Sequence, residues 1–508
     1  MKATFYNILS NIVARLWTVG ISIILLPIYT NIIGMESYGL VGFYSTMMGS
    51  LAILDLGLSS TLTREMARSK ALNVSAQSMC DLVYSLEIIY WGVGILIGVC
   101  VFFLAPTIAT SWVKAENLSI AQITNSVMIM GGIIAFQWPQ SIYTGGLMGL
   151  QRQVPYNIAT VILSTLKSVG VIVVLKLVSP TVETFFVWQI FISCLSVFIL
   201  RYLLWQYVPQ SESKVIFSKV ELKKIWRFAA GMTTIGLATF CLSQVDKVVL
   251  SKVLPLKEYG YYMLAWTVGT SILLIVSILG NTLLPKITEI VARGDEQEIK
   301  VNYHRFNRLM ASGVVPVGVL LCLFSKEIIG IWTNNVETTN EIWLAASILT
   351  AGSICNAFMN VPYYLMLANG LTRFTVYQNI IASIILTPLL FWWTNKWGLT
   401  GASLVWFSVN FGYIIISLPL IHRILLKGEL LKVYVYDMGI SIVCSLFVIG
   451  SAKIVCQINI ITPLIQVCIM ILSLVITYLC IIFFSDEYKK IMYRLRKKYV
   501  FYSTNKCL

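Results

Sequence analysis

Residues 7–33 read NILSNIVARLWTVGISIILLPIYTNII, a run of 27 residues that exceeds the roughly 20 apolar residues needed to cross a bilayer core. Arg15 lies inside this run, roughly 12 Å from Asn7 along a helix axis. The polar residues of the run fall on one helical face: Asn7, Asn11, Arg15, Thr18 and Ser22. A helix surrounded by lipid would not carry this stripe, so we expect it to meet a polar partner or a water-filled cavity.

The composition of the whole chain extends this pattern. Its 508 residues are 58% hydrophobic and only 12% charged, whereas soluble domains average about 25% charged residues. The sequence therefore predicts an all-α polytopic membrane protein. No soluble segment is long enough to fold alone, so membrane topology explains the net charge of +15 better than nucleic-acid binding does.

The residues that usually mark metal or nucleotide chemistry are scarce. The eleven cysteines form no C-x-x-C pair, and the two histidines lie near predicted helix ends. No G-x-x-x-x-G-K-[ST] phosphate loop occurs. We therefore expect no metal site, no cofactor and no ATP motor within the chain.

Hydrophobic runs separated by short polar turns predict about fourteen membrane spans. Lys and Arg in alternate loops number 27 on the side of both termini and 7 on the other side. This bias predicts cytoplasmic termini, and an even number of spans fits, because it places both termini on the same side. The approximate span bounds are 7–33, 40–63, 81–105, 120–147, 156–178, 184–204, 226–251, 260–284, 308–331, 342–367, 376–394, 400–421, 434–456 and 462–484.

A weak internal repeat recurs at an offset of 221 residues. Ser37-Tyr38-Gly39 is echoed by Glu258-Tyr259-Gly260, and Gly149-Leu150 by Gly370-Leu371. Six spans fit within one copy, so both copies keep the same orientation, as in parallel-repeat transporters. The predicted parts are two six-helix lobes, two additional transmembrane helices and a basic cytoplasmic tail: 1–211, 212–428, 429–485 and 486–508.

Several ionisable residues lie inside the predicted spans, at a cost of at least ~2.5–3.5 kcal/mol each. We expect the first, second, fifth and seventh spans to line a polar chamber. Its basic members suit a phosphorylated substrate, because Lys and Arg donate charge-assisted hydrogen bonds to phosphate. The predicted substrate-binding residues are Arg15, Lys167 and Lys247. Further chamber residues, some with a role in ion coupling, are Asn11, Asp55, Ser164 and Asp246.

Structural alternatives stand beside this chamber. Arg15 and Asp55 lie at similar depths and could form an ion pair within the first lobe. Lys247 lies towards a helix end and could extend to the lipid head groups. Asp246 could carry a coupling proton in place of contacting the substrate.

Three motifs carry a family resemblance: ESYGL at 36–40, LDLGLSSTLTRE at 54–65, and VDKVVLSK at 245–252 followed by EYGYY at 258–262. Residues 1 to about 430 resemble the Wzx-type polysaccharide flippases of the multidrug/oligosaccharidyl-lipid/polysaccharide exporter superfamily. The resemblance implies a multi-pass protein of the bacterial inner (plasma) membrane. It would flip an undecaprenyl-diphosphate-linked oligosaccharide by alternating access, for O-antigen, capsule or exopolysaccharide assembly.

The resemblance also implies binding partners for this chain, and it leaves alternative functions open. The expected partners are the lipid-linked oligosaccharide, membrane lipids, a polysaccharide polymerase, a chain-length regulator and a coupling proton or sodium ion. A lipid II-type flippase and a cation-coupled multidrug antiporter share the expected fold, although an antiporter's chamber should be acidic or apolar. A membrane enzyme of polysaccharide assembly would need a larger extramembrane loop. The longest loops, about 205–225 and 285–307, are short and basic, so we do not expect an enzyme.

Overall fold

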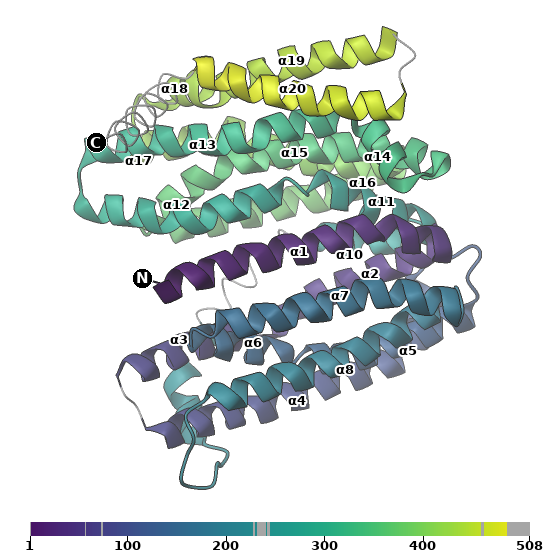
Figure 1. Cartoon of the computed structure of the whole chain (residues 1–508), viewed down its shortest axis with the longest axis vertical. Coiled ribbons are helices and arrows are strands. Elements are labelled where there is room, and N and C mark those ends of the chain that lie inside the picture. The colour runs from purple at the N-terminus through teal and green to yellow at the C-terminus, as the bar shows by residue number, and fades with distance from the viewer. Residues whose placement is uncertain are drawn as a thin grey trace, which may run out of the picture. The chain divides into compact units, whose positions relative to one another are not determined.

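The computed structural model describes residues 2–55, 57–72, 75–226, 229–230, 240, 244–458 and 462–484. Within these ranges the regular structure is helical, with no strand. Eleven of the helical segments in these ranges are long and apolar enough to cross a membrane. The chain divides into two compact units, Met1–Met263 and Leu264–Leu508, each built of long helices packed side by side (Figure 1). The predicted all-α membrane class is confirmed.

The eleven segments overlap twelve of the fourteen predicted spans, although Leu273–Arg293 covers only about half of the predicted span 260–284. Tyr377–Leu425 contains two of them, which are separated by a kink at Gly398 (φ 53°, ψ −132°). The predicted span 226–251 falls partly outside the described residues. The remaining span, 40–63, is divided, because Gly57 adopts a left-handed conformation (φ 66°) that favours glycine. The count of fourteen stays a prediction.

In the first unit, the longest helices pack as neighbouring pairs. α1 packs against α7, α4 against α5, and α8 against both α5 and α7 (Figure 1). Pro139 separates α5 from α6, and a capping box at Ser119 begins α5. The elements are α1 (Lys2–Ile33), α2 (Met35–Leu51), the 3₁₀ helix η1 (Ala52–Asp55), α3 (Leu58–Ala71), α4 (Ala76–Thr107), the π-helix η2 (Ile108–Trp112), α5 (Ile120–Gln137), α6 (Gln140–Gly149), α7 (Gln153–Leu177), α8 (Val182–Tyr207), α10 (Val245–Val253) and α11 (Leu256–Gly269), which crosses into the second unit.

In the second unit, α13 packs against α15, and the last two long helices, α19 and α20, pack on α13 (Figure 1). Its core includes Phe306, Phe324, Phe358 and Leu365. The elements are α12 (Leu273–Arg293), α13 (Glu296–Leu323), α14 (Ser325–Thr333), α15 (Val336–Ala368), α16 (Thr372–Gly412), the π-helix η3 (Tyr413–Ser417), α17 (Leu418–Leu425), α18 (Leu430–Lys432), the π-helix η4 (Val433–Gly439), α19 (Ile440–Ile458) and α20 (Pro463–Phe484).

Helix bounds recur at nearly the predicted offset. α2 begins at Met35 and α11 at Leu256, exactly 221 residues later, while α4 begins at Ala76 and α13 at Glu296. The compact units nevertheless divide after Met263 rather than at 211, because α10 packs against α2 and Leu256 lies against Gly39. The predicted lobes stay a prediction from the repeat, whereas the compact units describe the packing. The predicted tail 486–508 lies outside the described residues.

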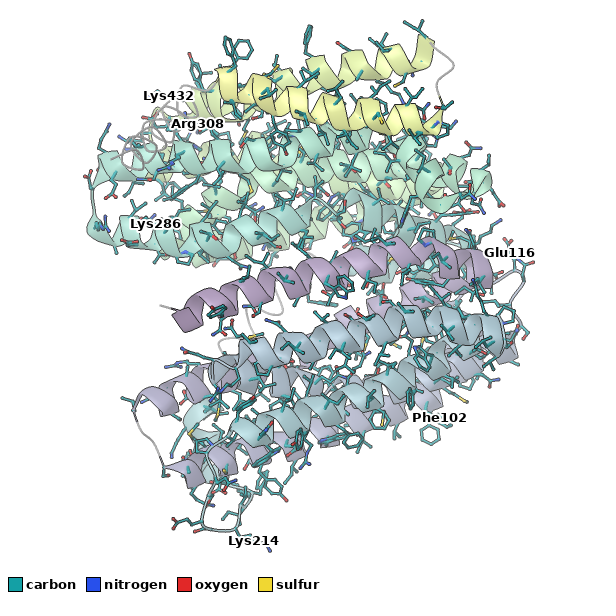
Figure 2. All side chains as sticks on the ribbon, in the orientation of Figure 1. Phe102, Glu116, Lys214, Lys286, Arg308 and Lys432 are labelled. Carbon is teal, nitrogen blue, oxygen red and sulfur yellow. The ribbon has the colours of Figure 1, made fainter. Side chains whose placement is uncertain are left out.

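Charged side chains mark the ends of each unit. Figure 2 shows Lys214 and Glu116 at opposite ends of the first unit. In the second unit, Lys286, Arg308 and Lys432 lie at one common end (Figure 2). All four of the basic residues belong to the side that the Lys/Arg bias assigns to the cytoplasm, which stays a prediction.

Candidate functional site

The polar stripe of α1 begins with amides that bind α7. The Asn11 side-chain NH₂ donates to Gln153 Oε1 at 2.7 Å, and the Asn157 NH₂ donates to Asn11 Oδ1 at 2.6 Å. One and a half turns further on, Trp17 Nε1 donates to Thr165 Oγ1 at 2.9 Å. Residue numbers rise together on both helices, so α1 and α7 run parallel. This half of the stripe therefore meets a polar partner, which is the first of the two environments expected for it.

Two cations follow in the same part of this helix pair. Arg15 is exposed on α1, and Lys167 is partly buried on α7. Among the residues that the structure describes, neither side chain has a hydrogen-bond or ion-pair partner, although the Arg15 backbone carbonyl accepts from Thr18 Oγ1 at 3.1 Å. With Trp17 opposite Thr165, the two cations differ in level by only about four residues, or roughly 6 Å. Neighbouring Ser164 donates to Val161 O at 3.0 Å, so its hydroxyl is bound within its own helix.

Asp55 is held by hydroxyl groups and not by Arg15. Its Oδ1 accepts from Tyr90 OH at 2.7 Å and from Ser141 Oγ at 3.2 Å, and its Oδ2 accepts from Ser59 Oγ at 2.8 Å. These hydrogen bonds attach the end of η1, where the chain turns into α3, to α4 and α6. The alternative of an Arg15–Asp55 ion pair is absent from this structure, so the Arg15 guanidinium keeps its positive charge uncompensated.

Asp246 and Lys247 form a separate pair on α10. Lys247 Nζ lies 3.3 Å from Asp246 Oδ2, and the two side chains are only 8% and 9% exposed. Tyr262 OH contacts the same carboxylate at 3.4 Å. This pair is neutralised internally, unlike Arg15 and Lys167. Thr239 and Ser243, which helical spacing places on the same face of the seventh predicted span as Asp246, lie outside the described residues.

Glu87 is a buried carboxylate that the sequence patterns above do not single out. It accepts hydrogen bonds from Tyr143 OH at 2.6 Å, from Trp205 Nε1 at 3.2 Å and from Arg201 Nε. These donors come from α6 and α8, so Glu87 ties both helices to α4. The signal was present: Glu87 is an ionisable residue inside the predicted span 81–105, which is the criterion that singled out Arg15.

A second carboxylate, Glu36, lies between the first two predicted spans. It accepts hydrogen bonds from the backbone N–H of Glu116 at 2.6 Å and from the backbone and side chain of Asn117 at 3.0 and 2.9 Å. Burial raises the pKa of the Glu36 carboxyl, but these hydrogen bonds outweigh burial and hold the pKa below its ordinary value. Glu36 thus anchors the start of α2 to the loop after η2.

No group of three or more His, Cys, Asp or Glu side chains within the described ranges is arranged to hold a metal ion. The uncompensated cations on α1 and α7 are basic groups that the described part of the first unit offers to a ligand. Such a pair attracts anions, and phosphate oxygens are the acceptors that Arg and Lys bind most directly.

Comparison with known proteins gives two kinds of likeness. The family model described as "Polysaccharide biosynthesis protein" matches residues 4–291. A Shigella flexneri protein named "Putative O-antigen transporter" is 20% identical over 376 residues, which are 74% of this chain and 87% of that protein.

Solved structures share the fold at low identity. Lipid II flippase MurJ in an inward closed conformation has a TM-score of 0.68 at 14% identity, with 96% of this chain and 99% of that chain covered. An inward-facing multidrug resistance MATE family transporter of the MOP superfamily has a TM-score of 0.63 at 13% identity, with 84% and 96% covered. The unmatched sixth of this chain is about as long as residues 429–508.

Proposed function

Because the chain belongs to the polysaccharide biosynthesis protein family, we propose that it is a flippase for an undecaprenyl-diphosphate-linked oligosaccharide repeat unit. It moves this substrate across the bacterial inner membrane for O-antigen, capsule or exopolysaccharide assembly. The observation that carries the proposal is the pair of uncompensated cations, Arg15 and Lys167, on adjacent parallel helices.

The energetic argument concerns where such cations can persist. An unpaired charge inside a membrane span costs at least ~2.5–3.5 kcal/mol, and two such charges on neighbouring helices also repel each other. A diphosphate relieves both costs, because its oxygens accept charge-assisted hydrogen bonds from Arg15 and Lys167 together. The sugar and diphosphate pass through the polar chamber while the lipid chain stays in the bilayer.

The transport cycle we propose is alternating access about the parallel repeat. Asp55 accepts three hydroxyl hydrogen bonds and acts in this scheme as a structural residue of the chamber. The paired Asp246 and Lys247 form a polar group outside the diphosphate site, with Asp246 as the carboxylate for a coupling proton or sodium ion. The transport step involves no covalent chemistry. A polymerase and a chain-length regulator then act on the translocated repeat unit.

The test is export by charge-removing variants. Arg15→Ala and Lys167→Ala should each lower export about 10- to 150-fold, since a hydrogen bond to a charged group contributes about 1.5–3 kcal/mol. Lys176→Ala is the matched control, because Lys176 is an exposed lysine on the same helix. The readout is lipid-linked glycan retained on the cytoplasmic leaflet at normal protein levels. Full export by both alanine variants would overturn the proposed site.

A lipid II-type flippase is the second candidate, because the MurJ match covers 96% of this chain. That likeness concerns the fold, while the substrates differ in their sugars. Loading the purified protein into vesicles with either lipid II or a polyprenyl-diphosphate oligosaccharide separates the two. We expect flipping of the oligosaccharide at the higher rate, and exclusive flipping of lipid II would reverse the assignment.

A further inference from the structure

Two glycines bring α2 and α11 into backbone contact. A Cβ added to Gly39 would overlap the carbonyl oxygen of Leu256, and a Cβ added to Gly260 would lie 2.5 Å from Met35 O and 3.0 Å from Gly39 N. Carbon atoms do not approach backbone atoms this closely without displacement. Both helices therefore need glycine at this crossing.

The two contacts are equivalent under the internal repeat. Gly39 and Gly260 are separated by the repeat offset of 221 residues, and so are Met35 and Leu256. Each repeat thus places its own glycine against the first residue of the other repeat's helix. This is the pattern of a two-fold contact, in which one surface patch meets its own equivalent, and it lies wholly within the first compact unit.

Polar links surround the glycine contact. Thr46 Oγ1 and Tyr259 OH lie 2.5 Å apart, and these residues are only 3% and 1% exposed. At the rim, the Leu256 N–H donates to Lys114 O at 2.7 Å, and Lys114 Nζ donates to Val253 O at 3.0 Å. Backbone apposition and single hydrogen bonds can separate without repacking interlocked side chains.

We propose that the Gly39–Gly260 contact is the closed outer gate of the transport path. This inference rests on the proposed function, and the predicted topology places the end of α1, and hence this contact, on the outer side. Closure brings the equivalent ends of the two repeats together, and opening separates them. Thr46 and Tyr259 form the layer behind the gate that becomes exposed when it opens.

The experiment measures access to that layer in intact cells. The reporter is Thr46→Cys, in a full-length chain whose eleven native cysteines are replaced, labelled with a membrane-impermeant maleimide. Gly39→Ala and Gly260→Ala should each raise the labelling rate about 5- to 150-fold, the shift expected when overpacking disfavours one state by about 1–3 kcal/mol. Export should fall in both variants.

Controls separate gate opening from a general glycine effect. Gly92→Ala adds a Cβ that meets nothing within 4 Å on α4, and it should leave labelling unchanged. Gly42→Ala meets the flexible Met263 side chain at 2.6 Å and should raise labelling less than Gly39→Ala does. It also provides a second variant if Gly39→Ala fails to accumulate.

The outcomes distinguish the gate from the substrate site. Unchanged labelling in either of the two variants Gly39→Ala and Gly260→Ala would overturn the paired gate, because equivalent contacts must act alike. Arg15→Ala should lose export while labelling stays at the parental rate. If Arg15→Ala and Lys167→Ala keep full export while both glycine variants raise labelling, the proposed substrate site is wrong and the gate stands.

Discussion

Replacing Asn157 tests whether amide pairing fixes α1 against α7. Asn157 is 6% exposed and donates to Asn11 Oδ1 at 2.6 Å and to Ser10 Oγ at 3.0 Å. Hydrogen bonds between membrane helices average about 0.6 kcal/mol and reach about 1.7 kcal/mol in double-mutant cycles. Losing both should therefore cost about 1–2 kcal/mol, well below the 5–15 kcal/mol that typically holds a protein folded.

The assay is a double-mutant cycle of Asn11→Ala and Asn157→Ala, followed by thermal unfolding of the purified protein in detergent. We expect a coupling free energy of about 0.6 kcal/mol or more, together with reduced export, because Arg15 is placed one turn beyond Asn11. Asn360→Ala is the control, since the Asn360 NH₂ donates to Asn356 O within its own helix. Additivity of the two alanine effects within about 0.3 kcal/mol would refute the pairing argument.

Three further predictions concern anchors outside the chamber. Glu87→Ala should lower the free energy of unfolding by about 3 kcal/mol, because it leaves the half-exposed Arg201 and two aromatic side-chain donors unpaired. Glu87→Gln should lower the free energy of unfolding less, and thermal unfolding of both variants measures the difference. The Glu36 pKa is lower in the folded protein, so its stabilisation is present above its unfolded pKa of about 4.3 and disappears as pH falls through the folded value. The Tm difference between wild type and Glu36→Gln should thus be constant from neutral pH to about pH 5 and shrink below about pH 4. Lys453→Met removes the ion pair with Glu327 at 2.5 Å and should make α19 more sensitive to limited proteolysis, whereas unchanged cleavage would show that apolar packing alone holds that helix.

Hydropathy and the repeat predict the class of this fold well, and they fail at local breaks. The run 40–63 is predominantly apolar, so it resembles a single span, but the chain turns at Gly57 (φ 66°). Hydropathy averages over a window and is insensitive to one residue's φ. Turn chemistry offered the missing signal, because Asp55 and Gly57 are both residues that favour breaks in a helix.

The candidate site shows a similar limit. The sequence places Arg15 and Lys167 within spans, but it does not show that their helices are neighbours. Asp55 binds Tyr90 and Ser141, which are 35 and 86 residues away. Such partners are chosen by how helices pack, and helical periodicity on one span contains no information about the next.

The ion pairs that η4 and α19 make with α13 and with the residues just beyond it limit how α13 can bend. His304 and Arg308, in the first half of α13, contact Asp437 of η4 at 2.5 and 3.5 Å. Glu327, just beyond the end of α13, contacts Lys453 of α19. Pro316 lies between these two points and removes a backbone hydrogen bond where a helix can bend. Because α13 is held on both sides of Pro316, these ion pairs with η4 and α19 oppose bending of the helix at this proline.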